Sequence, residues 1–379
     1  MMPVSSAAGL ASEQARHVVA VDARTLSQTG KGIPRFLAET LRELAGHPRL
    51  KLILFSNRPL HPAHALPIDT VIDSAWSRAP GSLWMMARLN KLAARAGADT
   101  VWGPAHVLPG RRAGLRSVLT VHDLVHRIMP ESMGAWNKRI SQWLVEPSIH
   151  RADRIIADSI ATRDDVLSLV QPRQQNIEVV YLGARVLSPD AIMAARTATK
   201  PDAPYLFSLG SIEPRKNIDG LLQCFKHLQV KFPALSLRLT GAHSWSASET
   251  LAAIDRNEAC HLLGFLSDAE LTAQMAGTRA FIMPSHYEGF GLPVIEAVGL
   301  APIIAADIPV FRELGQFIEG ICFIDFSDPV VAATAIAQFL ASDPAPARFI
   351  NGGAELFQWQ TTARRYAEIF LSDDMQVEL

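Results

Sequence analysis

The sequence predicts an α/β protein made of two doubly wound, Rossmann-like lobes that face a central cleft. Its 379 residues exceed one domain of typical size and suit two. Short apolar strands alternate with helix-like segments along residues 17–181, and the alternation resumes at residue 205 after a pause. Ligands of such sheets bind at the carboxyl ends of the strands, so we expect the site in the crevice between the lobes.

The first lobe is expected to alternate β-branched strands with amphipathic helices. The strands are predicted at residues 17–22, 50–56, 117–122, 154–158 and 177–181. The helices are predicted at residues 34–45 and 162–170. Parallel strands joined by helices are covered on both faces, which explains why these strands read as nearly continuous apolar runs.

A linker and a second lobe follow. Residues 184–204 carry the turns Ser188-Pro189-Asp190 and Lys200-Pro201-Asp202 and are expected to connect the lobes with some helix inside. Further strands are predicted at residues 205–209, 235–240, 261–263, 281–283 and 302–305, and helices at residues 218–231 and 293–298. These signals assign residues 1–190 to an N-terminal lobe and residues 204–354 to a C-terminal lobe.

Composition favours a folded protein and excludes several classes. Hydrophobic residues make up 49% of the chain and charged residues 19%, which excludes disorder of the whole chain. The three cysteines, Cys224, Cys260 and Cys322, form no CxxC pair, so neither a disulfide framework nor a zinc site is expected. The start lacks the pattern of an export signal, and no apolar run approaches the roughly 20 residues that span a bilayer. We therefore expect a cytoplasmic chain.

The net charge of −1 hides a basic region in the first lobe. Residues 76–151 hold eleven Lys or Arg against four acids, together with five of the seven Trp. A helix-like stretch there starts near Trp84 and carries a cationic stripe, Arg88, Lys91 and Arg95. Cations beside aromatic residues suit an anionic membrane surface, and an ordinary amphipathic helix with a solvated basic edge is the alternative. Nucleic acid is not expected as a partner, because the pI is about 6.9 and no binding motif occurs.

The most informative segment runs Glu288-Gly289-Phe290-Gly291-Leu292-Pro293-Val294-Ile295-Glu296-Ala297. It follows an apolar strand and leads into a helix whose first position suits Pro293. The two glycines let main-chain N–H groups approach a ligand, and open amides at a helix start attract an anion such as a diphosphate. Glu288 and Glu296 could both accept hydrogen bonds from the hydroxyls of one ligand. A glycine-rich turn with a helix-capping Glu is the simpler alternative.

A second segment, Gly210-Ser211-Ile212-Glu213-Pro214-Arg215-Lys216-Asn217, also follows a strand and opens a helix. Asn217 is expected to cap that helix. Arg215 and Lys216 put two positive charges at the mouth of the first crossover of the second lobe. Phosphate oxygens would accept charge-assisted hydrogen bonds at that position, whereas a solvated basic pair is the alternative.

The first lobe offers two weaker motifs. Gly30-Lys31-Gly32-Ile33-Pro34-Arg35 lacks the spacing of a dinucleotide fingerprint or a P-loop, so we expect a loop over the cleft. Val121-His122-Asp123 ends a strand, where side chains point into the crevice, although a structural His–Asp pair is the alternative. No Asp-x-Asp or His-Glu-x-x-His occurs, so Mg²⁺ or Mn²⁺ would lack carboxylate ligands and catalysis without a metal is expected.

Together these segments resemble the group 1 glycosyltransferases, family 4 of the retaining enzymes with the GT-B fold. The likeness extends from Gly30 to about Trp359 and is strongest at residues 210–217 and in the Glu-x7-Glu block, residues 288–296. Further matches are His122-Asp123, Asp158-Ser159, Val180-Tyr181-Leu182-Gly183 and Gly264-Phe265-Leu266-Ser267-Asp268. Many relatives place an Arg where Ser211 stands here. The resemblance also implies that a C-terminal helix, about residues 355–379, crosses back onto the first lobe.

The resemblance implies catalytic roles for four residues. Arg215 and Lys216 would bind the donor diphosphate and support its departure. Glu288 would lie at the transferred sugar, and His122 would contact that sugar from the opposite lobe. Retention of configuration follows from the family alone. Two carboxylates would ordinarily suggest double displacement, yet we favour a leaving diphosphate that helps to deprotonate the acceptor on the same face.

Eight further residues would bind the donor, according to the same resemblance. Glu296 would hold the ribose hydroxyls, Phe265 and Leu266 would line the base pocket, and two glycines would shape the loop near the phosphates. The complete set is Gly30, Gly32, Phe265, Leu266, Phe290, Gly291, Leu292 and Glu296. Neither a metal nor another cofactor is expected beside the nucleotide sugar.

The two main motifs look most like those of mannosyltransferases that use GDP-mannose. This likeness implies transfer of mannose to a polyprenyl-diphosphate-linked oligosaccharide in exopolysaccharide or O-antigen assembly, at the inner face of the cell membrane. Two alternatives stay open: a GT-B epimerase acting on a nucleotide sugar, and a non-catalytic two-lobed protein that binds sugar nucleotides. Product analysis separates the first alternative from a transferase, and binding without turnover would support the second.

Overall fold

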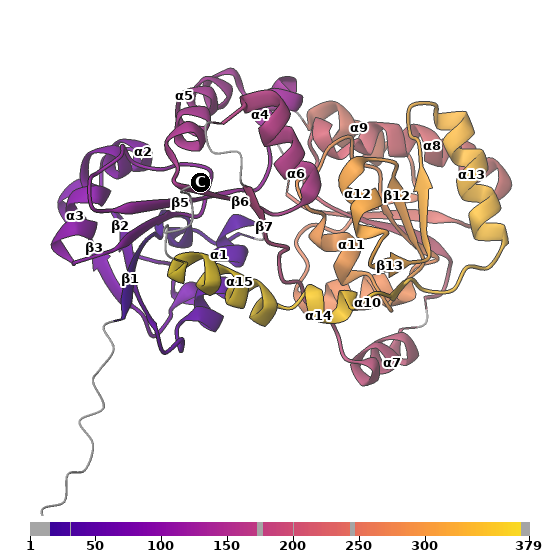
Figure 1. Cartoon of the computed structure of the whole chain (residues 1–379). Coiled ribbons are helices and arrows are strands. Elements are labelled where there is room, and N and C mark those ends of the chain that lie inside the picture. Colours follow the sequence, from indigo (N-terminus) through magenta and orange to yellow (C-terminus); the bar gives the residue numbers. More distant parts are fainter. Residues whose placement is uncertain (1–15, 31, 173–176, 200, 243–246, 373–379) are drawn as a thin grey trace, which may run out of the picture.

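Seven parallel strands form the sheet of the first lobe (Figure 1). Along the chain they are β1 (His17–Asp22), β2 (Leu50–Ser56), β3 (Asp69–Ile72), β4 (Thr100–Gly103), β5 (Arg116–Val121), β6 (Arg154–Ala157) and β7 (Ile177–Val179). Their order in space, β3-β2-β1-β4-β5-β6-β7, has its topological switch between β1 and β4. The computed structural model describes residues 16–30, 32–172, 177–199, 201–242 and 247–372.

Six parallel strands repeat this design in the second lobe. They are β8 (Tyr205–Leu209), β9 (Ser236–Thr240), β10 (Cys260–Leu262), β11 (Ala280–Met283), β12 (Ile303–Ala306) and β14 (Ile321–Ile324). Their order, β10-β9-β8-β11-β12-β14, switches between β8 and β11. A separate antiparallel pair joins β13 (Ile318–Glu319) to β15 (Arg348–Phe349). The predicted α/β class with two Rossmann-like lobes is confirmed.

Helices connect the strands of each lobe. The first lobe has α1 (Ile33–Leu44), α2 (Gly81–Trp84), α3 (Asn90–Arg95), α4 (Val125–Ile128), α5 (Ala135–Arg151) and α6 (Ile160–Asp165), with π-helical segments at Met85–Leu89 and Val166–Val170. The link contains α7 (Pro189–Ala198), and the second lobe has α8 (Ile218–Lys231), α9 (Ser248–Asp255), α10 (Asp268–Gly277), α11 (Leu292–Glu296), α12 (Pro309–Leu314) and α13 (Pro329–Ala341).

Strand β1 illustrates why the strands of this fold are apolar throughout. Its side chains alternate between the two faces of the sheet, so successive residues enter different cores. Val19 and Val21 belong to the core that contains Phe36 of α1, whereas Ala20 belongs to the core that contains Leu89. Helices therefore cover both faces of the sheet, as expected for parallel strands.

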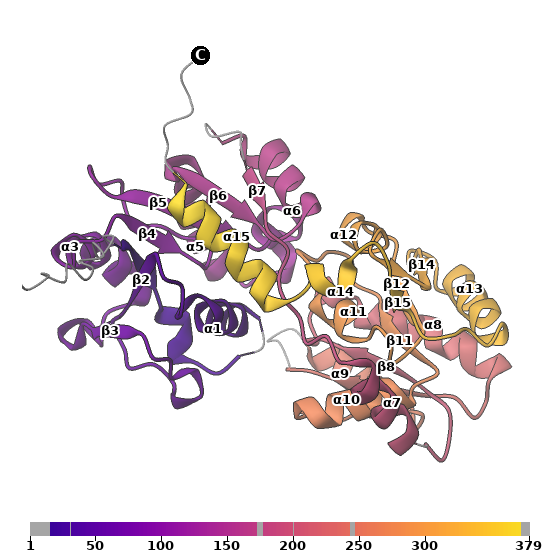
Figure 2. The ribbon, with the colours of Figure 1, turned by 60° about the horizontal axis from the view of Figure 1, so that its bottom comes forward.

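The chain returns to the first lobe at its end. After α14 (Gly353–Leu356), helix α15 (Trp359–Leu371) lies beside α1 (Figures 1 and 2). Tyr366 and Phe370 of α15 pack on Trp102, with ring centroids 5.0 and 5.3 Å away. Arg116 donates to main-chain carbonyls at the end of α15, including that of Ile369 at 2.9 Å. A cation suits the negative end of the helix dipole. Residues 373–379 of the expected crossover segment lie outside the described residues.

The basic, Trp-rich region of the first lobe is less exposed than its sequence suggests. Trp84 is completely buried, and Arg88 donates to Asp73 at 3.0 Å and lies 5.9 Å from the ring of Trp76. Because the indole of Trp84 is enclosed by protein, it cannot reach a membrane interface. Lys91 and Arg95 are exposed, and so is Trp143 of α5, whose exposed fraction is 79%. The side chains of Trp136 and Lys138 lie outside the described part.

Candidate active site

The loop after β11 brings the two lobes into contact. Its Gly289 carbonyl accepts hydrogen bonds from two hydroxyls of the first lobe, Ser159 Oγ at 2.7 Å and Thr162 Oγ1 at 3.0 Å. The same loop contacts the loop after β8, because the amide of His286 donates to the carbonyl of Arg215 at 2.9 Å. Three strand ends, those of β6, β8 and β11, thus meet at one junction.

Gly289 is required at this junction for steric reasons. A Cβ atom at this position would lie 1.8 Å from the carbonyl oxygen of His122, so no larger residue permits the contact. Gly291 has a φ of +99°, in the left-handed region that favours glycine. The sequence-based interpretation assigned both glycines to ligand access. In the structure, Gly289 instead packs against the first lobe.

The predicted cations and the first predicted carboxylate form one buried cluster. Arg215 Nη1 lies 2.7 Å from Glu288 Oε2, and Lys216 Nζ lies 2.5 Å from Glu288 Oε1. Ser285 Oγ donates to the same Oε1 at 2.7 Å, and Glu213 binds the other end of the Arg215 guanidinium at 2.7 Å. Glu288 is only 8% exposed. The structure therefore brings Arg215, Lys216 and Glu288 together, and their roles towards a donor stay predictions.

Electrostatics keep this cluster ionised. Burial opposes the charge on Glu288, but Lys216 and Arg215 outweigh it and lower its pKa to about 2. Burial also opposes the charge on Arg215, and Glu288 and Glu213 overcome this effect and raise its pKa. At neutral pH the site thus holds a carboxylate locked between two cations, which is a weak base and a weak nucleophile.

Main-chain amides complete the anion-accepting side of the junction. Across the described residues, the amides of Phe290, Gly291 and Leu292 donate to no protein acceptor. Asn217 stands at the start of α8 as expected, but its side chain makes no capping bond. It donates instead to the carbonyl of Pro284 at 3.1 Å, which ties the two loops together. Open amides beside two cations can accept the oxygens of a diphosphate.

His122 is held within its own lobe. Its Nδ1 lies 2.6 Å from Asp158 Oδ2, and its Nε2 lies 2.8 Å from the carbonyl oxygen of Pro104. Burial lowers the pKa of His122, but the Asp158 carboxylate and the Pro104 carbonyl outweigh it and raise the pKa overall. Both ring nitrogens therefore have partners within the first lobe. His122 forms a structural pair, as the simpler alternative predicted, but its partner is Asp158 and not Asp123. The contact of His122 with a sugar stays a prediction.

Glu296 makes a second contact between the lobes. Its Oε1 lies 2.7 Å from Nη1 of Arg35, and the side chains are 6% and 24% exposed. Arg35 belongs to α1 directly after the glycine loop, in which Gly30 and Gly32 are described and Lys31 lies outside the described residues. The role of Glu296 at a ribose stays a prediction.

The predicted base-pocket residues lie in the loop between β10 and α10. Phe265 is 83% exposed and Leu266 packs partly against the core of the second lobe. An exposed aromatic ring at the carboxyl edge of a sheet can stack on a flat heterocycle. Phe290, in contrast, is buried and stacks on Tyr181 at 6.0 Å, so only its main chain is available to a ligand.

Two bridging side chains at the junction were not predicted. The hydroxyl of Tyr287 accepts from the amide of Leu124 and donates to Asp165, both at 3.0 Å. Glu313 of α12 accepts from the first amides of α6, those of Ile160 at 2.7 Å and Ala161 at 3.0 Å. Tyr287 directly precedes Glu288, so its position in the motif was a usable signal. Nothing in the local sequence marks Glu313.

The described residues contain no metal cluster of the usual kind. No group of three or more His, Cys, Asp or Glu side chains is arranged there to hold an ion. Catalysis without a metal therefore stays a prediction. In the same described part, no helix combines the length and the apolar character of a membrane span.

Two facing Rossmann-like lobes with an anion-accepting junction define the GT-B class of glycosyltransferases. The family "Glycosyltransferase Family 4" matches residues 30–186, and "Glycosyl transferases group 1" matches residues 191–356. The chain belongs to the group 1 glycosyltransferases, family 4. The solved structure of sucrose-phosphate synthase from Thermosynechococcus elongatus has this fold, with a TM-score of 0.69, 17% identity and coverage of 94% of this chain and 98% of that one.

Curated relatives include two Escherichia coli proteins. The serotype-specific mannosyltransferase WbdA is 30% identical over 255 residues, which cover 61% of this chain and 30% of WbdA. The O-antigen chain mannosyltransferase B is 28% identical over 228 residues, which cover 56% of this chain and 58% of that protein. The chain thus spans less than two thirds of either relative.

The charged state of His122 predicts a specific pH dependence. A histidine with a raised pKa stabilises the fold fully below its unfolded pKa of about 6.5 and loses this contribution as pH rises through its folded pKa. His122→Gln should therefore be less stable than the wild type by about 3 kcal/mol at pH 6, and the gap should narrow towards pH 9. Urea unfolding across this pH range measures the gap. His227→Gln, an exposed histidine on α8, should leave the wild-type pH profile unchanged. A gap independent of pH would contradict the charged pair.

The Arg35–Glu296 pair predicts energetic coupling between the lobes. Arg35→Ala and Glu296→Ala should each destabilise the protein, and the double variant should lose less than the sum by about 1 kcal/mol. Thermal and urea unfolding of the four proteins measure this coupling. Arg42 and Glu39, an exposed pair on the same helix, provide the control cycle and should couple by about 0.3 kcal/mol. Strict additivity of the first cycle would show that the contact contributes nothing.

Proposed function

We propose that the chain is a retaining glycosyltransferase that moves mannose from GDP-mannose to a polyprenyl-diphosphate-linked oligosaccharide during cell-surface polysaccharide synthesis. The observation that carries the proposal is the buried Glu288 between Arg215 and Lys216 at the junction of the lobes. The named activities of the mannosyltransferase relatives support mannose as the transferred sugar. The lipid-linked acceptor rests on the resemblance of the motifs.

The two cations are suited to the leaving group. A departing nucleoside diphosphate gains negative charge in the transition state, and preorganised donors stabilise that charge most strongly in a site with little water. Arg215 can offer a planar fork to phosphate oxygens, and Lys216 a compact charge. The free amides of Gly291 and Leu292 are available for the same oxygens. Binding of the diphosphate would shift part of the cationic charge away from Glu288.

Glu288 is better suited to hold a hydroxyl than to attack carbon. Its low pKa and its two cationic partners reduce its basicity, whereas a covalent mechanism needs an activated nucleophile. A carboxylate of this kind orients Arg215 and Lys216 and accepts a hydrogen bond from the sugar. This argument favours departure of the diphosphate and attack of the acceptor on the same face, with the diphosphate taking the proton.

We further propose peripheral attachment to an anionic membrane surface at the inner face of the cell membrane. The support is the exposed Trp143 on α5 together with the exposed Lys91 and Arg95 on α3. An indole and long cationic side chains bind the interface of a bilayer with anionic head groups. Arg88 is left out of this surface because Asp73 holds it.

The main test combines donor screening with turnover. GDP-mannose should raise the melting temperature of the full chain more than UDP- or ADP-sugars, and release of GDP should require a polyprenyl-diphosphate-linked acceptor. Lys216→Ala should lower kcat by about 100-fold, because Lys216 stabilises the departing diphosphate. Glu288→Gln should lower kcat by more than tenfold, because Glu288 holds the sugar and orients both cations. Lys226→Ala, an exposed lysine on α8, should leave kcat unchanged. Activity should survive exhaustive EDTA treatment.

Several outcomes would count against the proposal. A loss of less than tenfold in Glu288→Gln would remove Glu288 from the reacting sugar. Loss of activity in EDTA, with recovery on adding Mg²⁺ or Mn²⁺, would overturn catalysis without a metal. An epimerised nucleotide sugar without a new glycoside would identify an epimerase, and saturable donor binding without any turnover would identify a binding protein.

The membrane proposal has its own test. Sedimentation with phosphatidylglycerol vesicles should fall several-fold when Lys91→Glu, Arg95→Glu and Trp143→Ser are combined, because the first lobe then loses two exposed cations and an exposed indole. A variant with the same charge change on the second lobe, Lys231→Glu with Arg256→Glu, should sediment like the wild type. Equal sedimentation of both variants would remove the proposed surface.

A further inference from the structure

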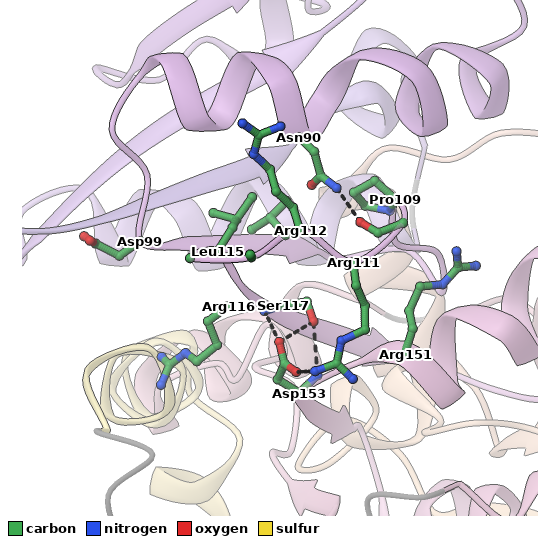
Figure 3. Close-up of a pocket in the computed structure, with 14 residues that line it drawn as sticks. Asn90, Asp99, Pro109, Arg111, Arg112, Leu115, Arg116, Ser117, Arg151 and Asp153 are labelled. Atoms are coloured by element: carbon green, nitrogen blue, oxygen red, sulfur yellow. Dashed lines mark hydrogen bonds and ion pairs between the residues drawn. The ribbon is translucent and has the colours of Figure 1, made fainter.

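A cavity of about 530 Å³ lies in the first lobe (Figure 3). It is lined by the loop 109–115, by Arg116 at the start of β5, and by Arg151 at the end of α5. The junction lies at the other end of β5, where His122 follows the strand. Six residues of strand separate the two ends by roughly 20 Å. The cavity is therefore not part of the candidate active site.

The lining of this cavity is rich in arginine. Four arginines and two carboxylates contribute to it, namely Arg111, Arg112, Arg116, Arg151, Asp99 and Asp153. Both carboxylates are already engaged. Asp153 accepts from Arg111 Nη2 at 2.6 Å and from Ser117 Oγ at 2.8 Å, as Figure 3 shows, and Asp99 accepts from the amide of Val18 at 2.7 Å. The cavity thus keeps a surplus of positive charge.

Two of these arginines lack a carboxylate partner in the described part of the chain. Arg151 donates only to neutral oxygens of its own helix, the carbonyl of Pro147 at 2.8 Å and Ser148 Oγ at 3.3 Å. The side chain of Arg112 makes no hydrogen bond or ion pair with the described residues. Burial lowers the pKa of Arg151. An anion in the cavity would offset this cost, and a guanidinium matches two oxygens of a phosphoryl group.

Asn90 is an uncharged polar residue in the lining of the same cavity. Its side-chain nitrogen donates to the carbonyl of Gly110, but its Oδ1 is buried and has no hydrogen-bond partner among the described residues. A buried carbonyl oxygen without a donor is costly, so a ligand that carries a hydroxyl would be favoured here.

We propose that this cavity binds a phosphate ester that carries a free hydroxyl group. Arg112 and Arg151 supply positive charge from opposite sides of the cavity, and Asn90 Oδ1 accepts from the hydroxyl. The volume is within the range of small-molecule sites and exceeds the need of an inorganic phosphate ion. The same chemistry occurs in a soluble glycerol or sugar phosphate and in the head group of phosphatidylglycerol. The site is independent of the proposed transfer reaction, because it shares no residue with the junction.

The soluble source is tested by calorimetric titration of the full chain with glycerol 3-phosphate at constant ionic strength, with sodium chloride as the blank. Saturable binding is expected, and Arg112→Ala with Arg151→Ala should weaken it at least tenfold. The matched control is Arg196→Ala with Arg256→Ala. Arg196 is exposed, and Arg256 Nε donates to the carbonyl of Ala252 at 2.9 Å, just as Arg151 does within α5. The control should bind like the wild type.

The lipid source is tested with phosphatidylglycerol and phosphatidylcholine vesicles. If the head group is the ligand, the cavity double variant should sediment less with phosphatidylglycerol than the control, and glycerol 3-phosphate should compete. Arg112→Ala alone removes an exposed side chain without polar contacts, so it keeps the test valid should the double variant fold poorly. Absence of saturable binding in both formats, or equal weakening in the control, overturns the proposal. Glycosyl transfer should be unchanged in the cavity variant, so this proposal and the proposed function can fail separately.

Discussion

The contact between Gly289 and the first lobe is the constraint on which the candidate site depends. Two hydroxyls donate to its carbonyl, and the absence of a side chain lets the carbonyl of His122, just after β5, approach it directly. Glu288 is the preceding residue, so the same contact fixes the carboxylate at the junction of the lobes. Arg215 and Lys216 then follow, because the backbone bond from His286 ties their loop to this one. A main-chain contact therefore positions a charged site.

Charge governs how that site can respond to a ligand. A carboxylate between two cations is stable only while all three stay ionised, so the site is organised before any donor arrives. Glu296 is organised differently, since its partner Arg35 comes from the other lobe. If ribose hydroxyls donate to Glu296, as the resemblance predicts, they must displace Arg35 from that carboxylate. Donor binding would then break a contact between the lobes and free the start of α1, which follows the glycine loop.

Local sequence patterns predicted the fold well, but they could not predict contacts between residues that are distant in the sequence. The bounds of β1, β2, β8 and α8 agree with the sequence, because buried parallel strands and an amphipathic helix carry strong periodic signals. Strand β3 was missed because it is short, largely exposed and at the sheet edge. The cationic pair and Glu288 were found because each motif is continuous. Arg35 and Glu313 were not, since their importance arises from partners in the other lobe.

The basic character of the first lobe can now be divided between different places. Some of its cations serve the fold, as Arg88 does with Asp73 and Arg127 with Glu146. Others gather at the amino edge of the sheet, where Arg112 and Arg151 lie without carboxylate partners among the described residues. The two cations beside Glu288, Arg215 and Lys216, come from the second lobe. The excess of positive charge in the first lobe therefore lies largely away from the cleft. Binding of a second anion at the opposite edge of the sheet, as proposed, would explain this excess.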